Sequence, residues 1–188
     1  MILKNFLITN TTKALFNKEN PTFFKKIGNV NIYTDFNFKV HIVNNISFII
    51  FGHINGYFEE KKFKKCKNII TVFKNLRFKN KIESEKIELI DGNFVIIEIK
   101  KNKNLKIVID KFSKNDLFYS SSVKKFLISN NFKLLTQNLN IKTINQPAIA
   151  LMMNTLGTRP AKKDTIINEV KRLGLNQKLK IENKLTII

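Results

Sequence analysis

The sequence predicts an α+β domain built mostly from antiparallel strands with a few short helices. The 188 residues are 43% hydrophobic and 26% charged, a composition typical of a globular protein that buries a core. Many short apolar segments alternate with turn residues, as strands of antiparallel sheets do. Residues 145–156 instead repeat their apolar side chains near helical spacing. We expect residues 1–188 to form a single domain.

In the first half of the chain, the apolar pattern favours strands. Residues 1–8 are apolar around one lysine, and residues 31–43 alternate like a half-buried strand pair or a bent strand. Residues 46–51 form a nearly continuous apolar run, which is typical of a strand buried on both faces. The two glycines of residues 52–56 predict a turn, and the charged residues 59–67 are expected to form a short helix.

Paired strands dominate the second half of the chain. Short apolar runs lie on either side of polar turns, so neighbouring runs are expected to form antiparallel hairpins. The expected pairs are 93–99 with 105–109, 117–120 with 125–129, and 177–181 with 184–188. The first pair should be central, with Phe94, Ile96 and Val108 buried. Two helices complete the prediction, a short one at 84–90 and a longer one at 145–156.

The net charge of +20 raises the question of a polyanionic partner. It comes from 34 Lys and Arg against 14 Asp and Glu, and only three of the cations are arginine. Phosphate sites favour the bidentate arginine fork, whereas Lys, Asn, Ile and Phe are residues of A/T-rich codons, so codon bias explains much of the charge. We therefore predict lysines spread over the surface, and binding to nucleic acid that is weak, non-specific and abolished by salt.

Aromatic rings beside lysines would be needed to bind single-stranded nucleic acid. The stretches that combine the two are Phe23 and Phe24 ahead of two lysines, and Phe73 to Phe78. We expect most of these rings to lie in the core, because an exposed apolar cluster is costly in a soluble monomer.

The residue counts exclude several other classes of protein. The single cysteine, Cys66, excludes a disulfide framework and a cysteine-based zinc site, and two histidines disfavour a histidine-rich metal site. The chain has no glycine-rich phosphate loop, so no cofactor is predicted. No apolar run approaches the roughly 20 residues of a membrane helix, and the first ten residues make a poor signal peptide, so a cytoplasmic protein is expected.

Several short motifs occur in a fixed order along the chain. They are FGHING at 51–56, LIDGNFV at 89–95, IDKFS at 109–113, FLIS at 126–129 and VKRL at 170–173. This series resembles the N-terminal domain of asparagine synthetases, a class II glutamine amidotransferase domain, whose motifs read NGEIYN, LDGDFAF, RDRFG, FASE and IKRL. The resemblance spans about two thirds of the chain.

The resemblance implies a fold and a catalytic site. The fold would be that of Ntn hydrolases, a four-layer sandwich of two antiparallel sheets flanked by helices. The family's nucleophile is an N-terminal cysteine activated by its own α-amino group, and the Asn-Gly of NGE forms the oxyanion hole. In this chain Ile2 follows Met1, and the NGE positions hold Phe51, Gly52 and His53. Phe51 cannot donate a hydrogen bond to an oxyanion.

The remaining site residues also depart from the family. Asp110 matches the aspartate of DRFG and is expected to serve its loop rather than catalysis, while Ser113 replaces the glycine. Cys66 is interior and has no α-amino group of its own, so we interpret it as structural, although neighbouring lysines could lower its pKa. The sequence therefore predicts no catalytic residue and no metal, and a vestigial substrate pocket at Phe51, Gly52, His53 and Asp110.

The predicted function follows from this damaged site. We expect a stand-alone, degenerate amidotransferase-like protein without glutaminase activity, which acts as scaffold or partner of a separately encoded, ATP-dependent, amide-forming synthetase. Two alternatives stay open. One is a basic domain that binds nucleic acid or an anionic surface, and the other is an enzyme with an unidentified nucleophile, such as a precursor cleaved before Thr11 or Thr12.

Overall fold

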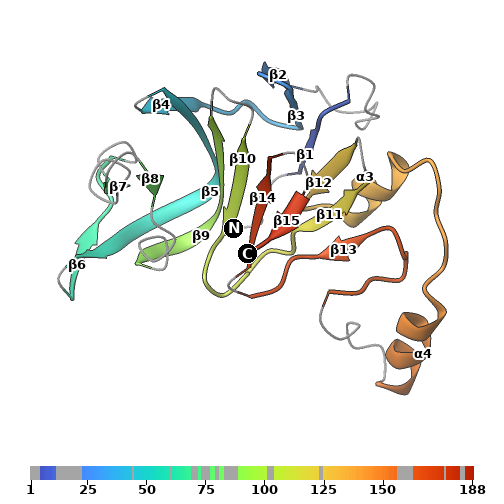
Figure 1. The fold of residues 1–188 in the computed structure, drawn as a ribbon. Coiled ribbons are helices and arrows are strands. Elements are labelled where there is room, and N and C mark those ends of the chain that lie inside the picture. Colours follow the sequence, from blue (N-terminus) through green and yellow to red (C-terminus); the bar gives the residue numbers. More distant parts are fainter. Residues whose placement is uncertain are drawn as a thin grey trace. The chain divides into compact units, whose positions relative to one another are not determined.

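Strands dominate the computed structural model (Figure 1). The described residues are 5–11, 23–43, 45–59, 61–68, 72, 77–78, 81–82, 89–100, 104–122, 125–155, 163–175, 177–182 and 185–188. Of these, 52% are in strands and 12% in helices, and every described strand pair is antiparallel. The two described helices are α3 (Phe132–Gln137) and α4 (Gln146–Asn154). The protein is therefore mostly β, and the predicted α+β four-layer sandwich flanked by helices is wrong.

The charged segment 59–67 contributes to this error, because it forms a strand rather than a helix. β6 (Lys62–Lys65) pairs with the end of β5 (Ile46–Glu59), and Phe58 lies directly opposite Phe63. Aromatic cross-strand pairs stabilise hairpins, and they outweigh the helix preference of the flanking lysines and glutamates.

The turn predicted at residues 52–56 is also absent. β5 continues through both glycines and pairs with β9 (Ile90–Lys100) along its length. The register shifts between Ile54 and Gly56, so the glycines mark a bulge within a long strand. Most of the helix predicted at 84–90 lies outside the described residues.

The chain divides into two compact units of interleaved segments, and the single domain stays a prediction. The first unit comprises Phe38–Lys114 and Leu175–Ile188, together with Met1–Leu3. Its main sheet has the order β15-β14-β10-β9-β5-β4, with β6 paired to β5, and β7 pairs with β8 separately. The remaining bounds are β4 (Val40–Val43), β7 (Arg77–Phe78), β8 (Lys81–Ile82), β10 (Leu105–Ile109), β14 (Lys178–Ile181) and β15 (Leu185–Ile187).

The central hairpin of this sheet is the one the sequence predicts. β9 and β10 pair in register from Leu105 opposite Ile99 to Ile109 opposite Val95. Neighbouring strands cover both sides of the hairpin, and Phe94, Ile96 and Val108 are exposed by only 1%, 1% and 3%. The central hairpin and the final hairpin of β14 and β15 are confirmed.

The second unit comprises Lys4–Asn37 and Asn115–Gly174. Its sheet has the order β13-β11-β12-β1-β3-β2. The bounds are β1 (Phe6–Thr9), β2 (Phe23–Ile27), β3 (Val30–Thr34), β11 (Phe118–Ser121), β12 (Phe126–Ser129) and β13 (Lys171–Arg172). The predicted pair of β11 and β12 is confirmed. Every residue of β1, β3 and β12 is buried, so the half-buried pattern predicted from residue 31 onward is wrong for β3.

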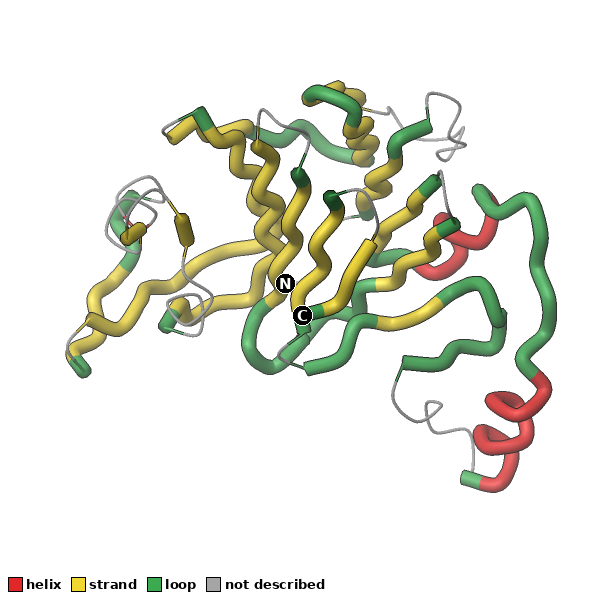
Figure 2. The backbone as a smooth tube through the Cα atoms, in the orientation of Figure 1, coloured by secondary structure: helices red, strands yellow, loops and turns green. Residues whose placement is uncertain are grey.

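The predicted helix at 145–156 is confirmed as α4. The Asn145 side chain caps it by accepting a hydrogen bond from the amide of Ala148 at 3.2 Å, and a proline lies in its first turn. Ala148 is its one buried residue. Figure 2 shows α4 at the end of the loop that leads from α3. Neither described helix is long and apolar enough to cross a lipid bilayer.

Candidate functional site

Phe51 lies in the interior of the first unit. It belongs to β5, is 0% exposed, and its ring packs edge-on against Phe38 with centroids 5.9 Å apart. A phenyl ring offers no hydrogen-bond donor, so this position cannot stabilise an oxyanion. The structure uses the side chain for packing instead.

Gly52 and Gly92 allow the backbones of β5 and β9 to approach each other closely. Gly52 has φ +97, and a Cβ at this position would lie 2.1 Å from the carbonyl oxygen of Asn93. A Cβ at Gly92 would lie 2.4 Å from the carbonyl oxygen of His53. His53 itself is opposite Asn93 and is exposed. Backbone therefore fills the space beside these glycines.

Asp110 is buried at the end of β10, with 3% of its surface exposed. Its Oδ1 accepts hydrogen bonds from the amides of Phe112 at 3.1 Å and Lys114 at 3.4 Å. Its own amide donates to the carbonyl of Phe94 at 3.1 Å. The carboxylate therefore shapes the loop that follows β10, as an Asx turn does.

The four predicted pocket residues are brought to one region of the sheet. Phe51, Gly52 and His53 are consecutive on β5, and Gly52 is opposite Phe94 on β9. Asp110 contacts the same Phe94 from the β10 side through its amide. The structure thus places Gly52 and Asp110 on either side of Phe94 of β9. Gly52 serves the close approach of two strands, and Asp110 serves the loop after β10.

Cys66 does not have the environment of a nucleophile. It is half-buried against the core cluster that includes Tyr57 and Val72, and its amide donates to the carbonyl of Asn55 at 2.8 Å. Burial raises the pKa of the Cys66 thiol, and a weaker hydrogen bond to Asn68 opposes the shift. The net shift is upward, so the lysines that could have lowered the pKa do not activate the thiol, which stays protonated at neutral pH. Ile2 lies outside the described residues.

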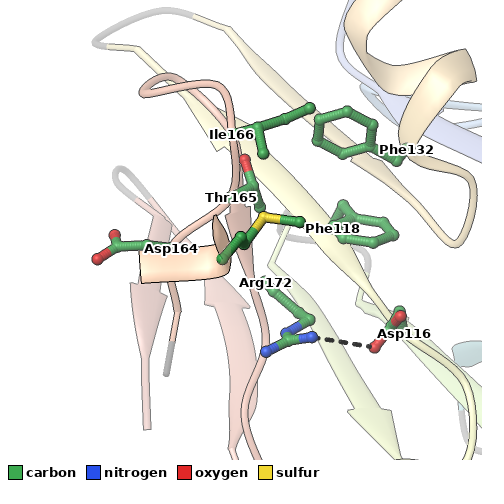
Figure 3. A pocket seen from close by; sticks show the side chains of 8 residues that line it. Asp116, Phe118, Phe132, Asp164, Thr165, Ile166 and Arg172 are labelled. Atoms are coloured by element: carbon green, nitrogen blue, oxygen red, sulfur yellow. Dashed lines mark ion pairs between the residues drawn. The ribbon is translucent and has the colours of Figure 1, made fainter. Parts of the chain in front are cut away.

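A pocket of about 200 Å³ lies in the second unit, and no pattern in the sequence pointed to it (Figure 3). Phe118 and Phe132 form one wall, with ring centroids 5.4 Å apart in an edge-on arrangement. The residues that complete the lining are Asp116, Met152, Asp164, Thr165, Ile166 and Arg172. They come from segments far apart in sequence, so no local motif identifies the pocket.

The polar groups around this pocket are engaged with one another. Arg172 faces Asp116 at 3.9 Å, as the dashed line in Figure 3 shows, and Lys171 pairs with Asp164 at 2.9 Å. The Thr165 hydroxyl donates to the carbonyl of Val170 at 2.8 Å. Among these groups, no nucleophile lies beside a general base. The lining is mainly apolar, so the pocket is suited to binding an apolar side chain.

The segment before α4 is anchored by Glu169. Its carboxylate accepts the amide of Thr143 at 3.0 Å and the Thr143 hydroxyl at 2.7 Å. These two hydrogen bonds lower the pKa of Glu169. Asn168 adds a bond from its side-chain amide to the Thr143 hydroxyl at 2.9 Å. These polar contacts therefore tie the loop before α4 to residues 168 and 169.

Four exposed apolar side chains lie on α4 and in the loop before it, and we call them the α4 surface. They are Ile141, Ile144, Leu151 and Met153, exposed by 69%, 64%, 39% and 75%. The helix itself, QPAIALMMN, carries no charged residue. Leu151 and Met153 are two residues apart and therefore lie on different sides of α4, so exposed apolar side chains are distributed around the helix. Exposed apolar groups of this kind mark surfaces that bind other molecules.

Two exposed edges of the sheets also combine aromatic rings with lysines. On the edge strand β2, Phe23 and Phe24 are exposed by 38% and 54%, so the expected burial of these rings is wrong. Lys25 and Lys26 follow them and are exposed. The second edge is the hairpin of β5 and β6. Phe73 and the ring of Phe78 lie outside the described residues.

Comparison with known proteins adds no family. No protein-family model matches the chain, and no curated protein sequence matches it. Among the described residues, no three His, Cys, Asp or Glu side chains are grouped so that they could hold a metal ion. Function is therefore inferred from the residues and their environment.

Proposed function

We propose that the protein is a non-catalytic, glutamine amidotransferase-like domain that serves as scaffold for an ATP-dependent, amide-forming synthetase partner. The observation that carries the proposal is the burial of Phe51. This ring stands where the resembling family has its oxyanion-hole asparagine, and it is 0% exposed. Cys66 has a raised thiol pKa and gives the chain no alternative nucleophile of that kind.

Local backbone geometry supports the resemblance. Ser113 replaces the glycine of the family's DRFG motif, and its φ of +46 lies in the left-handed region that favours glycine. The motif residues 90–95 and 126–129 lie in β9 and β12. A serine held in a glycine conformation is expected where an ancestral glycine has been replaced without a change of the loop.

The α4 surface is the proposed docking site for the partner. It lies between the FLIS and VKRL motifs that carry the resemblance, and the adjacent Met152 lines the apolar pocket beside Phe118. A net charge of +20 opposes pairing of two copies of this chain. The partner is therefore a different, acidic protein that presents apolar side chains to α4.

The test is co-expression with a synthetase-type protein encoded beside the gene of this chain. We expect a complex that Leu151→Asp with Met153→Asp weakens at least about tenfold, because buried apolar anchors carry interface energy. The double variant Gln146→Asp with Asn154→Asp is the matched control, since it adds the same charge at exposed polar positions of α4. Equal weakening by both pairs would contradict docking at the α4 surface.

A further inference from the structure

The hairpin of β5 and β6 displays two aromatic rings on its outer face. Phe58 and Phe63 are cross-strand neighbours with centroids 5.3 Å apart and an interplanar angle of 61°. They are exposed by 43% and 50%. The adjacent Tyr57 is only 6% exposed and packs in the core cluster of the first unit. Because strand side chains alternate, burial of Tyr57 turns Phe58 outward.

Gly56 shapes this aromatic surface. It is opposite Lys65, and a Cβ at Gly56 would lie 2.5 Å from Cζ of Phe63. The missing side chain therefore lets the Phe63 ring lie across the backbone of β5. The two rings contact each other, and Phe63 also packs against the backbone of β5, so together they form one aromatic platform.

Lysines are concentrated on the same hairpin as the platform. Lys61, Lys62, Lys64, Lys65 and Lys67 are all exposed, and they occupy five of the seven positions from 61 to 67. By strand alternation Lys65 projects on the same face as Phe58 and Phe63. Lys62 and Lys64 project on the other face, where Lys64 forms an ion pair with Glu59. Exposed lysines also occur in the second unit, as predicted for a dispersed charge, but those on this hairpin adjoin exposed rings.

We propose that the hairpin of β5 and β6 binds single-stranded nucleic acid. Bases stack on Phe58 and Phe63, while the lysines contact the phosphates that follow along the strand. The phosphates of a duplex could also contact the lysines, but its bases are paired and stacked inside the helix, where the rings cannot reach them. An acidic protein segment would likewise leave the flat aromatic faces without a stacking partner. A single strand uses both features, and stacking makes the binding tolerant of sequence.

This site goes beyond the proposed scaffold function and does not depend on it. It lies in the first unit, whereas the α4 surface lies in the second. Its loss and the loss of partner docking are therefore measured separately.

The β2 edge provides an internal comparison. Phe24 packs against the buried Tyr33 with centroids 5.0 Å apart, and β2 contributes two lysines. The Phe24 ring therefore packs partly against its own sheet, which leaves less of it for a base to stack on. The β2 edge also has two lysines, whereas residues 61–67 have five. We expect this edge to contribute little to binding.

The decisive experiment measures binding of the full chain to a labelled deoxythymidine oligomer of about 12 nucleotides by fluorescence anisotropy. Phe58→Leu with Phe63→Leu keeps the hairpin apolar but removes stacking, and we expect at least about tenfold weaker binding. Phe23→Leu with Phe24→Leu should change affinity less than about twofold. Phe58→Trp with Phe63→Trp should bind at least as tightly as the wild type, which separates stacking from folding.

Salt dependence tests the lysines. Lys65→Ala with Lys67→Ala should reduce the slope of log affinity against log salt by about 1.4, at about 0.7 for each lost phosphate contact. Lys133→Ala with Lys142→Ala removes the same charge from exposed positions of the second unit and should leave the slope nearly unchanged.

A single tryptophan gives a direct readout. The chain has no tryptophan, so Phe63→Trp introduces the sole one, and stacked bases should quench its fluorescence. Duplex binding as tight as single-strand binding would overturn the proposal. So would equal losses in both leucine pairs, indole fluorescence of the Phe63→Trp variant that is unquenched on binding, or binding to anionic phosphatidylserine vesicles without binding to the oligomer.

Discussion

The two halves of β5 have opposite environments. Residues 46–51 pair with β4 and β9, and Phe51 at their end is fully buried. Residues 52–59 begin with a glycine of φ +97 and contain a bulge, and they expose Phe58. They pair with β9 and, from Gly56 onward, with β6. One strand therefore buries Phe51 in the core and, a few residues later, exposes the aromatic ring of Phe58.

The bulge makes this change possible. An extra residue in one strand changes which side chains face the core, so the exposed and buried sets can be exchanged without ending the strand. The first half is under the constraint of core packing, and substitutions there should affect stability. The second half is under no such constraint on its outer face, and substitutions there should affect binding.

The greatest loss of stability should come from Phe51→Asn, which introduces the asparagine that the NGE motif of glutamine amidotransferases has at the matching position. It removes a fully buried ring and buries an amide without prepared partners, so we expect a loss of about 4 kcal/mol in the free energy of unfolding. Urea denaturation measures it, with Phe51→Leu as the control at about 1 kcal/mol. A mild Phe51→Asn effect would show that the first half of β5 is not closed by packing.

A somewhat smaller loss is expected at the point where β5 changes its environment. Gly52→Ala should cost about 3 kcal/mol, because it combines a left-handed φ with a Cβ only 2.1 Å from a backbone oxygen. Gly28→Ala is the matched control, since Gly28 has φ +59 but nothing within 4 Å of the added Cβ. That variant should cost about 1 kcal/mol. Equal costs would mean that the close approach of β5 and β9 is not a constraint.

A modest gain in stability is expected in the loop after β10. Ser113→Gly should stabilise the protein by about 1 kcal/mol, because it relieves a φ of +46 and removes a buried hydroxyl that has no hydrogen-bond partner among the described residues. Lys111→Gly in the same loop is the control and should destabilise, since it adds only chain entropy to the unfolded state. Thermal unfolding of the two variants measures the difference, and destabilisation by Ser113→Gly would count against a glycine-shaped loop.

The local hairpins could be predicted from the sequence because each has a continuous apolar run on both sides of a polar turn. The order of strands could not. β1 pairs with β12 through contacts such as Leu7 with Ser129, and no local pattern encodes a pairing at such a separation in sequence. The lysine-rich sequence of β6 is also typical of an exposed helix. Phe63 is stabilised by Phe58 on the neighbouring strand, and this pairing cannot be seen in the sequence of β6 alone.

Burial at the edges was similarly unpredictable. Phenylalanines usually pack in a core, yet the position of β2 at the end of a sheet leaves both phenylalanines of its FFKKI sequence exposed. The candidate residues of β5 are neighbours in sequence, whereas Asp110 comes to the same region only through the pairing of β5 and β10 with β9. No local pattern predicts that pairing. The pocket beside Phe118 depends on four separate segments and had no sequence signal.

Ammonia release from glutamine tests whether the first half of β5 is core rather than a catalytic site. The purified full chain should release no ammonia above the buffer rate at neutral pH, and Cys66→Ala should behave identically, because the buried Phe51 offers no donor to an oxyanion and the Cys66 thiol stays protonated. Turnover of glutamine by the wild type that persists in Cys66→Ala would reveal another nucleophile and show that the protein is an enzyme after all.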